Sequence, residues 1–224
     1  MKDLLNKIHH ADCLEFMKQL PDKCIDLVLT DPPFGIKFQS GHRIQKHEKI
    51  ANDDNLGWLP EWVEQTKRTC KDDAFLFIFC SWHFVDVFKS ELEKHLKVKN
   101  ILIWQKNNTG MGDLAGDFAP QYEMILFCNL GGKPLIGRRD SNILNFARTQ
   151  NELHPTQKPQ DLIGYLATKV IKTGIVLDCF SGSGTTALAC HDLGLNFICI
   201  EKDADYHAAS VERLEQHKRQ LRLL

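Results

Sequence analysis

An acidic side chain, two prolines and an aromatic ring stand together at Asp31, Pro32, Pro33 and Phe34. Each proline fixes its own φ near about −65° and pushes the preceding residue toward an extended conformation, so this corner is rigid. A carboxylate and nearby backbone carbonyls accept hydrogen bonds from an exocyclic amino group, and an aromatic ring stacks on a flat heterocycle. The corner therefore suits chemistry on an amine-bearing base, although an ordinary Pro-Pro turn after a core strand has the same pattern.

A second candidate site is the glycine-rich stretch at residues 180–186, Phe-Ser-Gly-Ser-Gly-Thr-Thr. Gly182, Gly184 and Ala187 match the fingerprint of dinucleotide-binding turns, in which the backbone approaches a cofactor closely. Glu201 follows at close to the usual distance for an acid that binds ribose hydroxyls. No Gly-Lys-Ser/Thr follows the turn, which excludes a P-loop. The stretch is a candidate cofactor site, and it would equally serve a nicotinamide-dependent oxidoreductase.

Each candidate site needs a strand to position it. Residues 25–30 hold a short apolar run that is typical of a strand covered on both faces, and the acidic corner follows directly. Residues 175–179 form a similar run before the glycine turn. A helix at 187–193, a strand at 197–200 and a long helix from about 204 complete a β-loop-α-β unit.

The remaining chain alternates between strands and helices. Further strands are predicted at 7–10 and 74–80, an amphipathic helix after Asp12, and helices at 59–70, 84–96 and 161–171. The runs at 98–106 and 122–128 are separated by a glycine-rich loop with no room for a helix. They predict an antiparallel pair at a sheet edge.

Composition is that of a globular protein with no strong partner preference. The 224 residues are 43% hydrophobic and 25% charged, with a formal net charge of −1. This length fits a single α/β domain, and the charge implies that a nucleic acid would be held by local basic patches. No apolar run reaches the roughly 18 residues of a membrane span, and the first residues lack a signal-peptide core. A cytoplasmic location is expected.

The eight cysteines form no Cys-x-x-Cys pair, and most lie in apolar segments. This spacing favours reduced core residues over a disulfide framework or a zinc site. No metal is expected.

Two irregular segments are basic. The first, residues 36–55, is predicted to be a mobile loop that grips phosphates beside the corner, and the second, about 130–153, is the candidate target-recognition segment. The first segment could also be a plain solvated loop. The basic residues expected to bind DNA are Lys37, Arg43, Lys46, Lys49, Arg138, Arg139 and Arg148.

The two motifs together resemble the S-adenosylmethionine-dependent DNA amino-methyltransferases. That family has an Asp/Asn/Ser-Pro-Pro-aromatic corner and an Asp-x-Phe-x-Gly-x-Gly cofactor loop, here residues 31–34 and 178–184. The corner precedes the basic segment, His-Pro-Thr-Gln-Lys-Pro at 154–159 and the cofactor loop, which is the order of the β group. The resemblance covers nearly the whole chain. It implies a circularly permuted, Rossmann-like α/β methyltransferase fold, with a seven-stranded, mostly parallel sheet and one antiparallel strand.

The resemblance also implies roles for individual residues. Phe180, Gly182, Gly184 and Thr185 would surround the methionine end of S-adenosylmethionine, Glu201 would hold its ribose, and Asp12 would bind its adenine amine. Asp12 is equally a candidate helix N-cap. The full set expected at the cofactor is Asp12, Asp31, Thr156, Lys158, Asp178, Phe180, Ser181, Gly182, Ser183, Gly184, Thr185, Thr186 and Glu201. The departure from the family pattern is Phe34, where tyrosine is more usual.

The expected activity is methyl transfer to a flipped-out base of double-stranded DNA. Asp at the first position of the corner goes mostly with the N6 amine of adenine within the family, so adenine is favoured over the N4 amine of cytosine. An RNA or protein-glutamine methyltransferase would share the corner chemistry, and a non-catalytic nucleic-acid-binding module is the competing hypothesis from a different class of protein. A homodimer on a palindromic site and a cognate restriction endonuclease are the expected partners.

Overall fold

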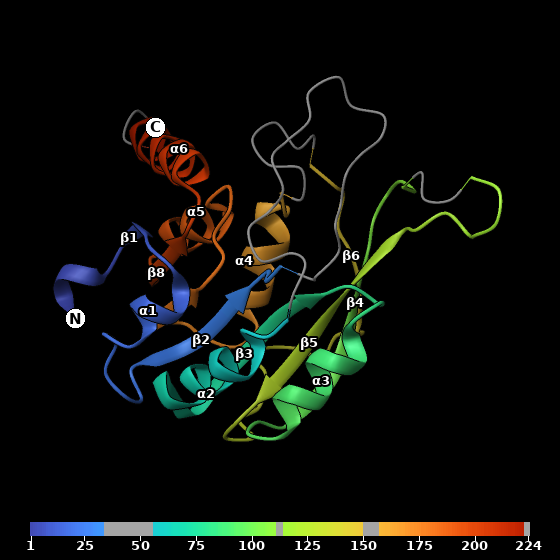
Figure 1. Ribbon diagram of the computed structural model, residues 1–224. Helices are drawn as coiled ribbons and strands as arrows, with labels where there is room; N and C mark the ends of the chain where they lie inside the picture. The colour runs from blue at the N-terminus through green and yellow to red at the C-terminus, as the bar shows by residue number, and fades with distance from the viewer. Residues whose placement is uncertain (34–55, 111–113, 150–156, 222–224) are drawn as a thin grey trace.

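The computed structural model describes residues 1–33, 56–110, 114–149 and 157–221 (Figure 1). Its strands are β1 (Lys7–His10), β2 (Ile25–Thr30), β3 (Cys70–Cys80), β4 (Val98–Gln105), β5 (Tyr122–Asn129), β6 (Ile143–Asn145), β7 (Ile175–Asp178) and β8 (Asn196–Glu201). Its helices are the short 3-10 helix η1 (Lys2–Leu4) and α1 (Cys13–Met17), α2 (Leu59–Thr69), α3 (Val85–Glu93), α4 (Gln160–Thr168), α5 (Thr185–Asp192) and α6 (Ala204–Leu221).

The described strands form one sheet in the order β1-β8-β7-β2-β3-β5-β4-β6. β5 runs antiparallel to its neighbours β3 and β4, and the other pairings are parallel. The antiparallel pairing of β4 with β5 was predicted, and so was a mostly parallel sheet with one reversed strand.

The strand count was wrong, because the sheet has eight strands rather than seven. The extra strand, β6, lies in the segment that was expected to be irregular, and it pairs in parallel with β4 to form the sheet edge. In β6, Leu144 is buried between two exposed residues. A run of three residues is too short for this alternation to be distinguished from a loop.

Helices cover both faces of the sheet, which gives three layers (Figure 1). Alternate residues of β3 divide between the two cores: Phe75, Phe77 and Phe79 pack with α4, α5 and α6, whereas Leu76 and Ile78 pack with α1, α2 and α3. Because side chains alternate across a strand, an almost continuous apolar run fills both cores. The run at 25–30 is buried in the same manner.

Strands β2 and β7 are neighbours in the sheet, and the chain continues from them toward opposite edges of the sheet. From β2 the chain passes through α2 to β3 on one side, and from β7 it passes through α5 to β8 on the other. In open α/β sheets, ligands bind at the carboxyl ends of the strands at such a switch point. The acidic corner follows β2 and the glycine turn follows β7, so both candidate sites lie at this point.

Several boundaries differ from the predicted ones. β3 begins at Cys70 rather than at residue 74, and α5 begins at Thr185 rather than at residue 187, because Gly184 acts as the N-cap with a φ of 76°. All eight cysteines lie in the described segments and are unpaired. None of the described helices has the length and apolar character needed to cross a membrane.

Candidate active site at the switch point

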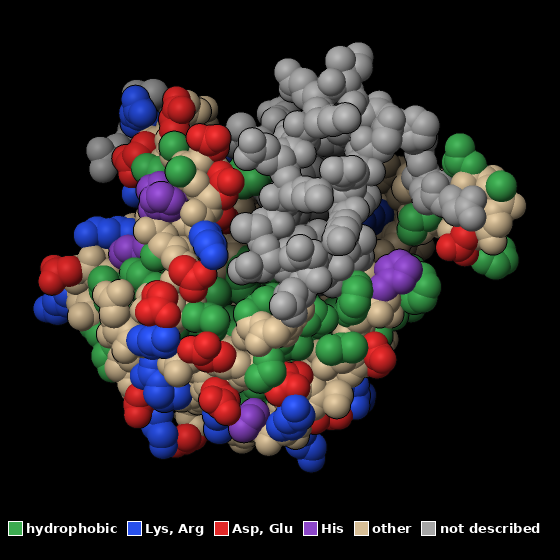
Figure 2. All heavy atoms as spheres, in the orientation of Figure 1, with side chains coloured by type: hydrophobic (Ala, Val, Ile, Leu, Met, Phe, Trp, Pro, Cys, Tyr) green, Lys and Arg blue, Asp and Glu red, His purple; other side chains and the backbone are tan. Residues whose placement is uncertain are grey.

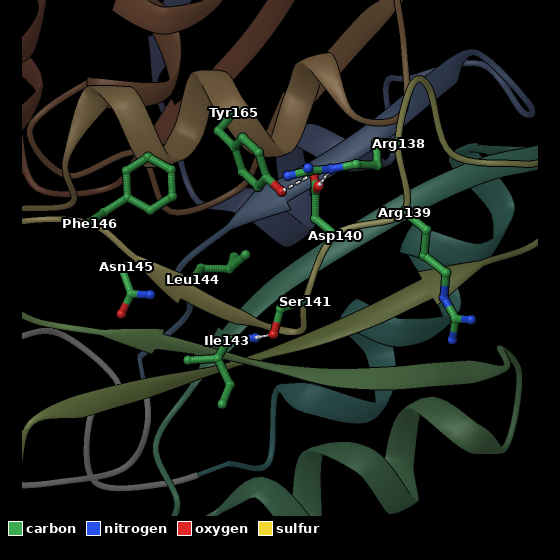
Figure 3. Close-up of a pocket in the computed structure, with 9 residues that line it drawn as sticks. All are labelled: Arg138, Arg139, Asp140, Ser141, Ile143, Leu144, Asn145, Phe146 and Tyr165. Atoms are coloured by element: carbon green, nitrogen blue, oxygen red, sulfur yellow. Dashed lines mark hydrogen bonds and ion pairs between the residues drawn. The ribbon is translucent and has the colours of Figure 1, made fainter.

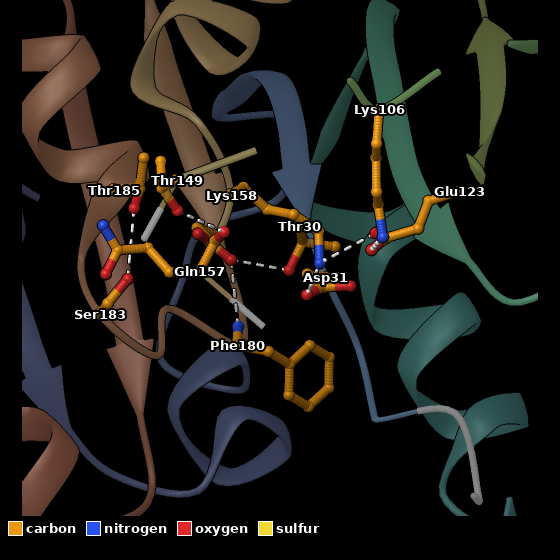
Figure 4. Close-up of polar contacts among 11 residues, drawn as sticks. Thr30, Asp31, Lys106, Glu123, Thr149, Gln157, Lys158, Phe180, Ser183 and Thr185 are labelled. Atoms are coloured by element: carbon orange, nitrogen blue, oxygen red, sulfur yellow. Dashed lines mark hydrogen bonds and ion pairs between the residues drawn. The ribbon is translucent and has the colours of Figure 1, made fainter. Parts of the chain in front are cut away.

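The acidic corner places one free carboxylate oxygen at the carboxyl end of β2. Asp31 forms an ion pair through Oδ2 with the ammonium of Lys158, while its Oδ1 is buried and has no hydrogen-bond partner among the described residues (Figure 4). Burial raises the pKa of Asp31, and the Lys158 ammonium opposes that rise. Pro32 and Pro33 follow in the described chain, whereas Phe34 lies outside the described residues. Oδ1 of Asp31 is thus a buried acceptor without a donor among the described residues.

A hydrogen bond ties the two candidate sites together. Thr30 Oγ1 donates to Asp178 Oδ1 at 2.7 Å and accepts from the Cys179 amide at 3.2 Å. The amide of Phe180 donates to the same Asp178 oxygen at 3.2 Å. Asp178 therefore shapes the start of the cofactor loop and fixes it to Thr30, the last residue of β2, which directly precedes Asp31.

Burial raises the pKa of Asp178 to about 6, although hydrogen bonds from Thr186, Thr30 and the Phe180 amide lower it. The folded protein then holds this proton more tightly than the unfolded chain does, where the ordinary pKa is 3.8. We expect this residue to lower the free energy of unfolding by up to about 3 kcal/mol as the pH rises from about 4 to about 6. Asp178→Asn, which keeps an acceptor oxygen, should remove that fall. Urea unfolding of both proteins without cofactor at the two pH values checks this, and equal pH dependence would contradict it.

The glycine turn is held from two sides. Gly182 and Gly184 have φ of 50° and 76°, a left-handed conformation that favours glycine. The Gly182 amide donates to Glu201 Oε2 at 2.7 Å, and the Asp203 amide donates to Oε1 at 2.8 Å. From α6, Arg213 donates to the Ser183 carbonyl at 2.9 Å. Glu201, expected as a ribose ligand, also fixes the turn itself.

Other predicted cofactor residues gather at the same edge. The Ser183 and Thr185 hydroxyls are 3.2 Å apart, and Ser181, Ser183, Thr185 and Thr186 are buried. The ring of Phe180 packs on the indoles of Trp58 and Trp62, at centroid distances of 5.3 Å and 6.2 Å. Lys158 lies on the Asp31 side of the site, and Thr156 lies outside the described residues.

Asp12 is the N-cap of α1 in this structure. Its Oδ1 accepts from the amides of Leu14 and Glu15 at 3.0 Å and 3.4 Å, and its Oδ2 pairs with Lys202 at 3.1 Å. The capping interpretation is thereby confirmed. The residue still lies beside Glu201, because the Ala11 amide donates to the Glu201 carbonyl at 3.0 Å.

The donor set fits S-adenosylmethionine. Three buried side-chain oxygens of predicted site residues and their chain neighbours have no hydrogen-bond partner within the described chain: Asp31 Oδ1 after β2, Ser181 Oγ after β7, and Gln157 Oε1 beside Lys158 in the sequence. The backbone carbonyl of Gln157 accepts from the Thr149 hydroxyl at 3.2 Å, and Gln157 directly precedes Lys158, which binds Asp31 (Figure 4). Buried polar atoms of this kind are normally paired, so unpaired acceptors beside a glycine turn fit a ligand with amino groups.

Two residues of the site were not predicted from the sequence. Glu123 from β5 lies 3.2 Å from the ammonium of Lys158, and Lys106, which follows β4, lies 2.7 Å from the other oxygen of Glu123. One signal was available in the sequence, namely the acidic Glu123 near the start of an otherwise apolar strand. Because a charged side chain is almost never buried without a partner, Glu123 could have been expected to pair with a basic residue.

Of the basic residues expected to bind DNA, the structure describes three, and all three are exposed: Arg138, Arg139 and Arg148. The other four lie outside the described residues: Lys37, Arg43, Lys46 and Lys49. Arg138 and Arg139 border a hollow of about 400 Å³ beside β6 (Figure 3). On the face of the molecule drawn in Figure 2, acidic and basic side chains are intermixed over the described residues, without a large patch of one sign.

Asp140 anchors the segment that carries these arginines. It accepts from the Tyr165 hydroxyl and the Lys169 ammonium, both at 2.8 Å, and pairs with Arg138 at 3.2 Å. These partners lower the pKa of Asp140 to about 2. The segment before β6 is therefore fixed to α4.

One described group of side chains has metal-ligand types: His191, Asp192 and His217 at the facing surfaces of α5 and α6. Both Asp192 oxygens already accept or pair, with His217 at 2.6 Å and with Gln160 at 2.6 Å. The Asp192 oxygens are therefore already engaged by protein side chains, and the group lies away from the site at the switch point.

A doubly wound sheet with a rigid acidic corner and a glycine turn at its switch point defines a nucleotide-cofactor enzyme of the α/β class. A family model described as DNA methylase matches residues 25–146 and 138–212. The chain belongs to this DNA methylase family.

Individual comparisons agree with this assignment. The putative methylase YubD of Escherichia coli (strain K12) is 29% identical over 213 residues, 94% of this chain and 90% of that protein. The crystal structure of an M1.HpyAVI–SAM complex matches with a TM-score of 0.70 and 27% identity, covering 93% of this chain and 98% of that one. The PvuII DNA methyltransferase (cytosine-N4-specific) shares the fold, with a TM-score of 0.74 and 15% identity over 95% and 91% of the two chains. The chain is an S-adenosylmethionine-dependent DNA amino-methyltransferase for adenine N6 or cytosine N4.

Proposed function

We propose that this enzyme methylates the N6 amine of adenine in a base flipped out of double-stranded DNA. The observation that carries the proposal is Asp31 Oδ1, a buried acceptor without a partner in the described chain, next to the cofactor turn. A carboxylate at this first position of the corner supports adenine, because Asp there goes mostly with adenine within the family. The fold does not choose the base, because the PvuII enzyme of the same fold is described as cytosine-N4-specific.

The corner activates a poor nucleophile. An exocyclic amine of a base shares its lone pair with the ring. We propose that the amine donates one hydrogen bond to Asp31 Oδ1 and another to the Pro32 carbonyl, which favours tetrahedral nitrogen and frees the lone pair. S-adenosylmethionine supplies an electrophilic methyl group. Holding the two reactants in near-attack geometry contributes roughly 7–11 kcal/mol relative to the bimolecular reaction.

The cofactor residues divide between its two ends. We assign the ribose to Glu201, the adenine amine of the cofactor to Asp12, and the methionine end to Phe180, the glycine turn and Asp178. Hydrogen bonds already made by Glu201 and Asp12 leave lone pairs on their oxygens, since an ionised carboxylate offers about four acceptor sites. Lys158 and Thr156 complete the pocket in this proposal.

We also propose that the basic segments at 36–55 and 130–153 contact DNA phosphates and bases. The exposed guanidinium groups of Arg138, Arg139 and Arg148 support the second part of this assignment. A homodimer on a palindromic site and a cognate restriction endonuclease remain the proposed partners. The order of corner before cofactor turn supports a circularly permuted methyltransferase fold.

We expect N6-methyladenine as the product. The test is to incubate the enzyme and labelled S-adenosylmethionine with unmethylated genomic DNA, RNA and protein pools, then digest the DNA to nucleosides and identify the product by mass and retention time. N4-methylcytosine as the main product would overturn the choice of base and leave the mechanism intact. Label in RNA or protein but not in DNA would overturn the substrate class.

A further inference from the structure

Four charged side chains alternate in sign from the catalytic corner into the sheet. Asp31 at the end of β2 binds Lys158, Lys158 also contacts Glu123 on β5 at 3.2 Å, and Glu123 binds Lys106 at 2.7 Å (Figure 4). The four side chains are between 7% and 23% exposed. Such charges are rarely withdrawn from water unless each is paired, so the row acts as one unit.

Lys158 lies between two carboxylates, and this fixes which oxygen of Asp31 it occupies. Its ammonium contacts Asp31 Oδ2 on one side and Glu123 Oε2 on the other, and it stands 5.1 Å from the ring centroid of Phe79. Burial alone would lower the pKa of Lys158, but the two carboxylates raise it, so the ammonium stays charged. With Lys158 kept on Oδ2, the other oxygen of Asp31 remains unpaired.

Glu123 is held in turn by Lys106. One oxygen of Glu123 faces each lysine, and these ammonium groups outweigh burial and keep the pKa of Glu123 below its usual range. Lys106 stands 5.0 Å from the ring centroid of Trp104, whose indole N–H donates to the Phe146 carbonyl at 2.8 Å. The far end of the row is therefore anchored to strands β4 and β5 rather than to a loop.

We propose that Glu123 and Lys106 are positioning residues for methyl transfer. Glu123 holds the Lys158 ammonium on Oδ2 of Asp31, which leaves Oδ1 directed at the target amine, and Lys106 keeps Glu123 charged and in place. Without Glu123, Lys158 loses one of its two carboxylates and neutralises Asp31 more strongly, which weakens the acceptor. The inference rests on the acceptor role proposed for Asp31.

Glu123→Gln tests the proposal through a single-turnover rate of methyl transfer to unmethylated genomic DNA, with calorimetry for S-adenosylmethionine and thermal melting measured in parallel. The rate should fall at least about tenfold, because the substitution acts on the transition state, while the dissociation constant of the cofactor stays within about threefold. Glu91→Gln is the matched control, since Glu91 of α3 pairs with Lys94, the C-cap of that helix, at 2.6 Å. It should leave the rate unchanged.

A second substitution separates positioning from stability. In Glu123→Gln, Lys106 becomes a buried charge without its partner carboxylate, and adding Lys106→Met removes that charge. The double variant should regain melting temperature and keep the slow rate. A double variant with the wild-type rate would assign Glu123 to stability alone, and a folded Glu123→Gln enzyme as fast as the wild type would equally overturn the inference. A wild-type enzyme inactive on DNA would instead reject the proposed function.

Discussion

Replacing Asp31 with alanine is expected to lower the rate of methyl transfer at least about 1,000-fold, because it removes the carboxylate that accepts from the target amine. Cofactor affinity should stay within about tenfold, since the glycine turn is held by Glu201 and Arg213 rather than by Asp31. Transfer of labelled methyl to DNA and calorimetric titration with S-adenosylmethionine measure the two quantities.

The control for this variant is Asp26→Ala. Asp26 lies near the start of β2, the strand that Asp31 follows, and its carboxylate also pairs with a lysine, Lys71, at 2.7 Å. This variant loses that ion pair and the hydrogen bond from the Ile175 amide to Asp26 Oδ2 at 2.9 Å, both at the end of the strands remote from the corner. Its rate should remain near that of the wild type. An Asp31→Ala enzyme with normal turnover would remove Asp31 from the mechanism.

Gly182→Val is expected to abolish measurable binding of S-adenosylmethionine. Gly182 has a φ of 50°, where a β-branched residue is strained, and its amide donates to Glu201. If the turn changes its conformation to relieve this strain, it loses the hydrogen bond to Glu201, and its backbone can no longer approach the cofactor closely. Calorimetry on the purified variant gives the affinity.

Gly194→Val separates this effect from backbone strain alone. Gly194 has a φ of 65°, and a Cβ built there meets nothing within 4 Å, so the variant carries a similar backbone penalty outside the turn. It should lose stability but bind the cofactor normally. Normal cofactor binding by Gly182→Val would refute the position assigned to the turn.

Local sequence patterns were sufficient to predict the two motifs and the positions of most strands. The corner at 31–34 and the turn at 180–186 are defined by consecutive residues, and their strands are short apolar runs bounded by turns. Their proximity followed from topology, because β2 and β7 are neighbours in a sheet where ligands bind at the switch point.

The row of charges could not be predicted because its members come from distant segments. Lys106 and Glu123 meet through the register of β4 with β5, in which Gln105 pairs with Tyr122 and Trp104 with Glu123. Lys158 lies in the segment that precedes α4, far from both residues in the sequence. No periodicity within one segment encodes such a contact. β6 was missed for the opposite reason, since its three residues give too little pattern.

The order in which the strands pair has a consequence during synthesis on the ribosome. β1 pairs with β8, where Lys7 faces Ile198, and β2 pairs with β7 near residue 176, so each of these strands is made well before that partner. During synthesis, β1 and β2 therefore lack these sheet partners until residues 175–201 have been translated. Pairings of such large sequence separation close slowly. A prematurely terminated chain that ends before β7 would carry the acidic corner but no cofactor turn, so truncated products have no means of methylating the genome.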